Sequence, residues 1–354
     1  TYIFVELRKQ TTALALRNKK TYYGKKIDDC NGNSKALFAC VNELLDKKSE
    51  SVLPSHTCKR ELANKFQSYF KEKIMNIRKS FTPPQRNQIH LGECDIVLNT
   101  FDPTNEDELR FIISEYGVNC PPEDPIPISL LKNNIESFIP IWLDIVNLSF
   151  EQGSTELLKN AILNPLIKEL EESIDIEILK NYRPVSNLTF LSKLIERVVA
   201  IRLESHMNMS GLHSSKQFGY KKNHSTELLL LKIVNNLLTS CDKKMANVLL
   251  LLDLSAAFDT VDQQKLLNIL QDKIGIRGPA LSWFKSYLLN RTQKVKIGNS
   301  YSKEQVLDYG VPQGSVLGPI LFNIYTRTFA EKINSIGFNV ANFADDHQLW
   351  KESS

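Results

Sequence analysis

The first half of the chain has apolar residues at helical spacing. They predict helices within residues 35–79, separated near Pro54, and again within 128–150. Thr104, with acidic residues three and four positions later, resembles a capping box and predicts that another helix begins there. The prolines between 121 and 127 end that helix. We therefore expect this half to be mainly helical.

After Gly153 the pattern changes to strands mixed with helices. Residues 161–167 predict a short strand, and residues 191–203 and 226–238 predict helices. The five consecutive apolar residues at 248–252 are typical of a strand that is buried on both faces. This mixture predicts an α+β domain with helices on one face of a sheet.

Length and charge indicate two regions. A chain of 354 residues with 42% hydrophobic and 24% charged residues can bury an ordinary core. We place a helical, basic region at 1–155 and an α+β region at 156–354. The net charge of +4 is unevenly spread, because residues 1–90 carry 18 Lys and Arg against 8 Asp and Glu. This favours a polyanionic partner such as RNA or DNA, although solvated Lys-rich helix faces explain the charge equally well.

Several classes of protein are disfavoured. No stretch has the roughly 20 apolar residues that a membrane helix needs, and the first residues contain no signal sequence, which predicts an intracellular protein. The six cysteines form no CxxC pair, and the nearest group, three cysteines and His56 within residues 30–58, fits no zinc spacing. We expect reduced thiols. Because the sequence starts at Thr1 rather than Met, we also expect a piece of a longer protein.

Two carboxylate motifs are the main candidates for chemistry. In LLLLDLSAAFDTVD, residues 249–262, Asp253 ends a strand, where it can bind a cation, although a turn or helix-capping Asp is the commoner case. In NVANFADDHQLW, residues 339–350, two apolar runs predict a hairpin that carries Asp345 and Asp346 at its turn. Adjacent carboxylates repel each other unless they share a cation, so a third acid and divalent ions would complete such a site.

A glycine-rich turn lies between the two carboxylate motifs. GVPQGSVLGP, residues 310–319, precedes an amphipathic helix expected at 320–333. Gly314 permits close approach of the backbone to a ligand and Gln313 offers a donor and an acceptor, whereas an ordinary turn is the simpler interpretation. The order and spacing of the motifs, 60 residues from Asp253 to Gln313 and 32 more to Asp345, strengthen the functional interpretation of all three.

These motifs resemble motifs A, B and C of reverse transcriptases. The likeness rests on Asp253 with Phe258, on PQG at 312–314 and on FADD at 343–346. A longer set is similar to jockey-type non-LTR (LINE-type) retrotransposons: NYRPVSNLTFLSKLIERVV (181–199), QFGYKKNHST (217–226), DLSAAFDTVD (253–262), WFKSYLLNR (283–291) and GVPQGSVLGPILFNIY (310–325). The resemblance covers about residues 161–350, with a weaker likeness upstream.

The resemblance implies the fingers and palm of a right-hand polymerase, with an antiparallel palm sheet backed by helices. It implies an RNA-directed DNA polymerase that joins a dNTP to the 3′-hydroxyl of a DNA primer or target on an RNA template. The carboxylates of Asp253, Asp345 and Asp346 would bind two Mg²⁺ ions, for which Mn²⁺ could substitute. The backbone carbonyl of Leu254 would assist.

Other motif residues receive roles from the same resemblance. Phe258 would lie under the sugar of the incoming nucleotide and exclude a 2′-hydroxyl, although an ordinary core position is the alternative. Gln313 and Gly314 would contact the new base pair and the template. Three basic residues of the fingers would neutralise the triphosphate, with a solvated surface position as the alternative: Arg183, Lys221 and Lys222.

The resemblance also predicts what this piece lacks. We expect the thumb and the last part of the palm to be missing after Trp350, an endonuclease upstream in the intact protein, and weak or no activity for this piece alone. The alternative function is a non-catalytic remnant that only binds nucleic acid, which a stop codon soon after Ser354 would favour. Phe258 and the FADD sequence disfavour an RNA-dependent RNA polymerase. Since such an enzyme meets both RNA and DNA, cytoplasm and nucleus both suit it.

Overall fold

The computed structural model describes residues 2–30, 34–44, 53–81, 96–116, 124, 126–155, 159–168 and 174–353. It divides the chain into two compact units, Thr1–Leu53 and Pro54–Ser354. The boundary that we expect at residue 155 stays a prediction. Two of the six cysteines, Cys94 and Cys120, lie outside the described residues, and the other four are free thiols.

The first unit contains two helices, α1 (Tyr2–Asp28) and α2 (Ser34–Leu44). The spacing of apolar residues predicts α2 but not α1, because the apolar residues of α1 do not gather on one side. Leu14 and Leu16 of α1 are exposed, whereas Cys40 of α2 is buried. A helix without an apolar stripe leaves no periodic signal in the sequence.

The second unit contains the remaining helices. They are α3 (Lys59–Lys79), α4 (Glu106–Ser114), α5 (Ile128–Asn133), α6 (Ile135–Gln152), α7 (Phe190–Met209), α8 (Thr226–Asp242), α9 (Gln263–Asp272), α10 (Gly278–Leu288) and α11 (Leu317–Ser335). The helices predicted within 35–79, 128–150, 191–203, 226–238 and 320–333 are confirmed. The helix expected from Thr104 is α4, but Asn105 is its N-cap and accepts a hydrogen bond from the Glu108 N–H. The Thr104 hydroxyl donates to the Glu108 carboxylate instead.

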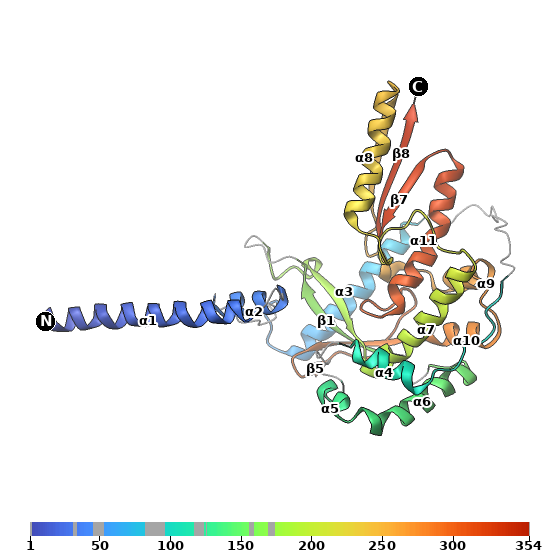
Figure 1. Cartoon of the computed structure of the whole chain (residues 1–354). Helices are drawn as coiled ribbons and strands as arrows, with labels where there is room; N and C mark the ends of the chain where they lie inside the picture. The colour runs from blue at the N-terminus through green and yellow to red at the C-terminus, as the bar shows by residue number, and fades with distance from the viewer. Residues whose placement is uncertain are drawn as a thin grey trace. The chain divides into compact units, whose positions relative to one another are not determined.

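Two sheets lie in this unit (Figure 1). The first has the strand order β2 (Tyr182–Asn187), β1 (Asn160–Ile167), β4 (Thr292–Ile297) and β5 (Ser300–Tyr301), with β6 (Gln305–Val306) also paired to β4. The second has the order β3 (Ala246–Asp253), β8 (Asp346–Ser353) and β7 (Asn339–Phe343), and both of its pairings are antiparallel. Helix α8 contacts β3 and β7, and α11 contacts β7. This is the α+β arrangement, an antiparallel sheet backed by helices, that the sequence predicts.

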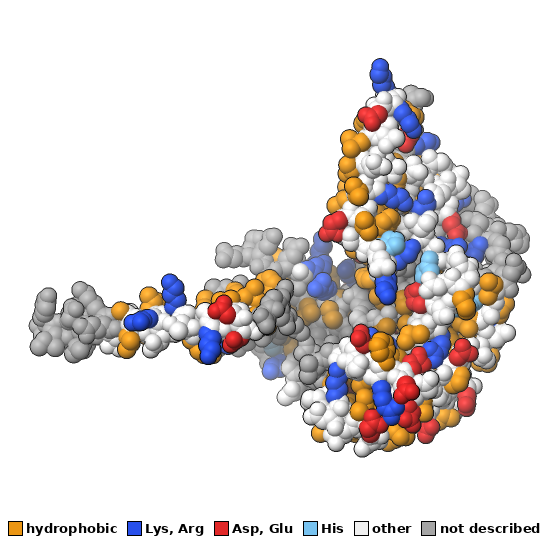
Figure 2. Space-filling model, viewed as in Figure 1, with side chains coloured by type: hydrophobic (Ala, Val, Ile, Leu, Met, Phe, Trp, Pro, Cys, Tyr) orange, Lys and Arg blue, Asp and Glu red, His pale blue; other side chains and the backbone are white. Residues whose placement is uncertain are grey.

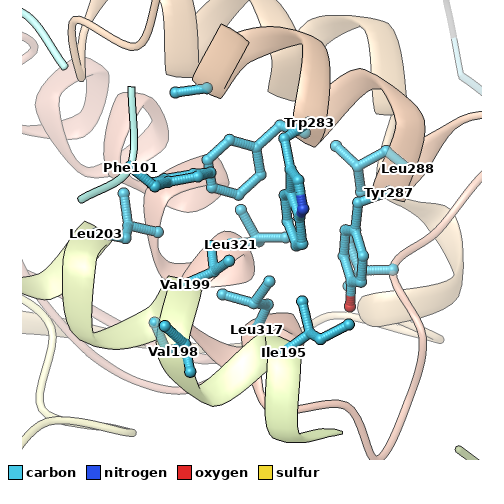
Figure 3. Packing of buried hydrophobic residues seen from close by; sticks show 14 of the residues in the cluster. Phe101, Ile195, Val198, Val199, Leu203, Trp283, Tyr287, Leu288, Leu317 and Leu321 are labelled. Carbon is cyan, nitrogen blue, oxygen red and sulfur yellow. The ribbon is translucent and has the colours of Figure 1, made fainter. Parts of the chain in front are cut away.

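The main core lies among the helices and holds α7, α10 and α11 together (Figure 3). Residues 195, 198, 199 and 203 of α7 recur at helical spacing and are all buried in this core, which also contains the aromatic side chains of α10. The Trp283 ring stacks on Tyr287, with centroids 5.4 Å apart, and its edge meets Phe101. Burying each such side chain stabilises the fold by roughly 1.5–3 kcal/mol. This packing holds the start of α11, and therefore the residues just before it.

The prediction that residues 248–252 are buried on both faces is wrong. All five are exposed, and Leu251 has 71% of its surface accessible. An unbroken apolar run indicates burial only where other elements cover both faces, and among the described residues β3 is an edge strand paired only with β8. Figure 2 shows that apolar side chains also gather along α8, where Leu228, Leu231 and Leu238 are exposed.

Among the described residues, no helix has the length and apolarity needed to cross a membrane.

Candidate active site

The second sheet brings together two carboxylates that are far apart in the sequence. In the register of β3 and β8, Asp253 lies directly opposite Asp346. In the hairpin of β7 and β8, Phe343 pairs with Asp346, so Ala344 and Asp345 form the two-residue turn. Residues directly opposite in an antiparallel pair have Cβ atoms about 4.5–5.5 Å apart. Two carboxylates at that spacing repel each other, and a shared cation removes the repulsion.

The donor chemistry of these carboxylates fits a hard divalent ion such as Mg²⁺. Asp253 and Asp346 are exposed and Asp345 is half-buried, so an ion from solvent can reach all three. Among the described residues, no three Asp, Glu, His or Cys side chains are gathered closely enough to hold an ion in their present positions. The assignment of these three carboxylates as candidate metal ligands therefore rests on the strand register and on the preference of such ions for oxygen donors. His347, next in β8, is buried against Phe329 of α11, and this burial lowers its pKa despite the nearby Asp345 and Asp346.

The glycine-rich turn is joined to the segment that follows Asp253. The Gly310 N–H donates to the Val261 carbonyl (2.8 Å), and the Val311 N–H donates to the Phe258 carbonyl (2.9 Å). Gly310 has φ +91°, and a Cβ there would lie 3.0 Å from the Asp259 carbonyl oxygen, so this contact requires glycine. The two motifs therefore meet through their backbones.

Gln313 and Gly314 contact the protein itself. The Gln313 side chain is half-buried, and its Nε2 donates to Asp259 Oδ1 at 2.8 Å. Gly314 has φ +88°, and a Cβ there would lie 2.9 Å from the Ser186 carbonyl oxygen of β2. The close approach that the sequence predicts for Gly314 is thus made, in this structure, to a strand of the first sheet.

Tyr220 lies near Asp345 and contacts Phe258. The Phe258 ring stacks on Phe322 of α11, with centroids 4.7 Å apart, and meets the edge of Tyr220 at 6.2 Å. Burial, followed by the negative charge of Asp345, raises the pKa of Tyr220. The Tyr220 ring therefore lies between Asp345, in the turn of the hairpin, and Phe258, which is expected to contact the sugar of the incoming nucleotide.

The three predicted basic residues do not form one cluster. Arg183 lies exposed on β2. Lys221 and Lys222 line a cavity of about 900 Å³ together with Tyr220 and Arg327. The Lys221 Nζ donates to the Ser214 carbonyl at 3.3 Å, and Lys222 is exposed. Only the two lysines are thus placed near Tyr220 and, through it, near Asp345.

Sequence reasoning misses the buried Glu196 of α7. Its Oε2 accepts hydrogen bonds from the N–H groups of Val316 (2.7 Å) and Leu317 (3.2 Å), so it caps α11 within the glycine-rich segment 310–319. Burial raises the pKa of Glu196, against these bonds and the charge of Arg291. The one signal in the sequence is an acid within a strongly apolar helix, which alone does not separate a buried acid from an exposed one.

Asp259 is a second group that sequence reasoning misses, and it makes a pH prediction possible. Burial raises its pKa from 3.8 to about 6, although Gln313 and Lys73 act in the opposite direction. The folded state therefore binds the proton of Asp259 more tightly than the unfolded state does. The contribution of this protonation to the free energy of unfolding is full below about pH 4 and is lost as the pH rises to about 6. We expect Asp259→Asn to be more stable than the wild type at pH 7 by about 1–2 kcal/mol, with little difference at pH 4.

Urea unfolding at pH 4 and pH 7 measures this effect. Asp308→Asn is the matched control. Because Asp308 is exposed, this substitution should leave the free energy of unfolding unchanged at both pH values. If Asp259→Asn and the wild type respond equally to pH, Asp259 does not titrate in this range.

Comparisons with known proteins agree with the motifs. The model of the reverse transcriptase (RNA-dependent DNA polymerase) family matches residues 168–353. The "Probable RNA-directed DNA polymerase from transposon X-element" of Drosophila melanogaster is 30% identical over 292 residues, covering 80% of this chain and 30% of the relative. A second relative in that organism, the "Probable RNA-directed DNA polymerase from transposon BS", is 37% identical over 42% of this chain and 16% of its own length.

Other matches agree at lower coverage. The "RNA-directed DNA polymerase from mobile element jockey" of Drosophila melanogaster is 32% identical over 49% of this chain and 19% of its own length. Among solved structures, a "Partial Cas6-RT-Cas1--Cas2 complex" has a TM-score of 0.35 and 21% identity over 70% of this chain and 38% of that chain, too low a similarity for comparing sites.

The curated relatives are much longer than the part that this chain matches, since it spans less than a third of their length. The family as a whole depends on divalent metal ions and acts on nucleic acid with dNTP substrates. The family model covers more than half of the chain, and the three relatives named above come from non-LTR elements. The chain therefore belongs to the reverse transcriptase family, as a reverse transcriptase of a non-LTR retrotransposon.

Proposed function

We propose that the chain contributes the fingers and palm of an RNA-directed DNA polymerase that copies the RNA of a mobile element. The observation that carries the proposal is the register of the second sheet, which sets Asp253 opposite Asp346 beside the turn residue Asp345. The substrates would be an RNA template, a DNA primer or target, and dNTPs. Such substrates fit a place of action inside the cell, in the cytoplasm or the nucleus.

The three carboxylates would be the ligands of two divalent ions. When bound, Mg²⁺, or Mn²⁺ in its place, stabilises the charge on the attacking and leaving oxygens of phosphoryl transfer. Asp253, Asp345 and Asp346 supply hard anionic oxygens, and the carbonyl of Leu254, just after β3, supplies a neutral one. Asp253 and Asp346 lie at the ends of paired strands, and Asp345 lies in the turn between β7 and β8. The sheet therefore limits how far these donors can move.

The glycine-rich turn would receive the base pair and template. Gln313 would contact the base pair while its Nε2 donates a hydrogen bond to Asp259. Gly314 would offer its backbone to the template from a turn that lies against β2. Lys221 and Lys222, which line the cavity beside Tyr220, would neutralise the triphosphate, as would Arg183 from the exposed face of β2.

Phe258 would select deoxynucleotides. Its ring is held by stacking on Phe322, so it is a rigid wall against a 2′-hydroxyl. We expect Phe258→Val to raise the ratio of kcat/KM for rNTPs to that for dNTPs by about 10-fold or more, or roughly 1.4 kcal/mol. Phe258→Tyr is the control, because it keeps the ring and should keep the ratio. An unchanged ratio in the valine variant would exclude this role.

Primer extension tests the proposal. The longest protein that the reading frame encodes is incubated with an RNA template annealed to a DNA primer, the four dNTPs and Mg²⁺. We expect DNA synthesis that stops when EDTA is added. Binding of the template and primer without any extension would contradict the polymerase and favour the alternative, a remnant that only binds nucleic acid.

A further inference from the structure

Gln217 is a buried side chain whose amide contacts the turn that carries the carboxylates. It lies in the segment between α7 and α8 and has only 5% of its surface exposed. Its Nε2 donates to the Ala344 carbonyl at 3.3 Å, and its Oε1 accepts from the Ala344 N–H at 3.1 Å. The same Oε1 accepts from the Gly219 N–H at 2.8 Å. One side chain thus satisfies both backbone polar groups of the residue before Asp345.

Ala344 is a position where such support matters. It has φ +55°, a left-handed conformation that is uncommon for a residue with a side chain, and it is buried. Without a hydrogen-bond partner, the buried N–H and carbonyl of Ala344 would each destabilise the turn. The amide of Gln217 provides the one acceptor that the Ala344 N–H needs and the one donor that the Ala344 carbonyl needs.

The backbone around Gln217 follows β7 closely. The Phe218 N–H donates to the Asn342 carbonyl, and the Asn342 N–H donates to the Lys216 carbonyl, both at 2.8 Å. Gln217 and Asn342 therefore form a parallel bridge. Gly219 lies so near that a Cβ there would be 2.2 Å from the Ala344 nitrogen, which no side chain could tolerate without movement. The segment is thus an additional support along the hairpin, with Gln217 aimed at its turn.

The chemistry of glutamine suits this position. The turn carries Asp345 and Asp346, and a negatively charged support would add to their repulsion. A neutral amide can hold the backbone without adding charge. An apolar side chain of the same size would fill the space but leave the Ala344 N–H and carbonyl without partners.

We propose that Gln217 is a positioning residue, which holds the Ala344 backbone so that the carboxylates of Asp345 and Asp346 are aligned for divalent ions. The inference rests on the proposed function, because it takes these carboxylates as metal ligands. Outer partners of metal ligands typically change metal affinity by 10–100-fold when they are removed. Gln217 acts one step further away, through the backbone, so we expect an effect near the lower end of that range.

The test measures Mn²⁺ binding to the chain by electron paramagnetic resonance, without nucleic acid or dNTP. Gln217→Met keeps the volume and removes the hydrogen bonds, and Gln217→Asn keeps the amide on a shorter side chain. We expect each to weaken Mn²⁺ binding by about 10-fold while circular dichroism shows a folded protein. Gln264→Met is the control, because Gln264 is exposed on α9, and it should bind Mn²⁺ like the wild type.

The outcomes separate the two proposals. Wild-type affinity in either folded Gln217 variant overturns the positioning role while leaving the polymerase proposal intact. Wild-type protein whose Mn²⁺ binding is absent, or does not depend on Asp345, overturns both. If Gln217→Met does not fold, Gln217→Asn decides. In the extension assay, we further expect the Mg²⁺ concentration for half-maximal rate to rise, with an unchanged KM for template and primer.

Discussion

Asp345→Asn is expected to lower the rate of primer extension by about 10³-fold or more, which corresponds to roughly 4 kcal/mol of lost transition-state stabilisation. The substitution keeps the size and shape of the side chain but removes the negative charge that a divalent ion requires. Asp345 lies in the turn between β7 and β8, beside the facing pair Asp253 and Asp346. The protein should remain folded, because the half-buried side chain belongs to a turn and not to the core.

The measurement is RNA-templated primer extension at saturating Mg²⁺, together with Mn²⁺ binding. Asp242→Asn is the matched control, since Asp242 is an exposed acid at the end of α8, and it should retain the full rate. A variant at position 345 that extends primers as fast as the wild type would show that the carboxylate of Asp345 does not take part in the reaction.

Glu196→Ala is expected to lower the free energy of unfolding by about 3–5 kcal/mol, the usual effect of breaking a buried charged contact. The substitution removes the acceptor of the Val316 and Leu317 N–H groups, and it removes the carboxylate whose charge interacts with the fully buried Arg291. Because Val316 and Leu317 lie in the same glycine-rich segment as Gln313, the loss should also disturb the turn that contains Gln313.

Urea unfolding at pH 7 measures this loss. Glu196→Gln is the control: its Oε1 can still accept from both N–H groups, so only the charge is removed and the loss should be about 1–2 kcal/mol. If alanine destabilises the protein by less than about 1 kcal/mol, the contact between α7 and the start of α11 does not hold that region together.

The predicted helices and the hairpin at 339–350 agree with the structure because local patterns determine them. The apolar positions of 191–203 repeat at helical spacing, and all of them except the exposed Ile201 belong to the core side of α7. Two apolar runs around Asp345 and Asp346 predict a hairpin, and β7 and β8 form it. Each signal is contained within one element, so neighbouring residues suffice to read it.

The wrong prediction for β3 has the opposite cause. Five apolar residues in a row measure how well a segment would tolerate burial, whereas burial itself depends on which elements pack against it. Leu251 shows the difference, since it lies on an edge strand and stays exposed. Helix α1 was likewise invisible to periodicity, because its apolar residues are spread around the helix.

By itself, the sequence determined the family, the order of the three motifs and the residue types available for chemistry, since these depend only on which side chains follow one another. The tertiary structure alone decided which of them meet. The strand register sets Asp253 opposite Asp346, and the packing of α7 and of the segment before α8 brings Glu196 and Gln217 to the backbones of the two functional turns. Such contacts join residues more than 90 positions apart, and no local pattern encodes a hydrogen bond between a buried side chain and a distant backbone.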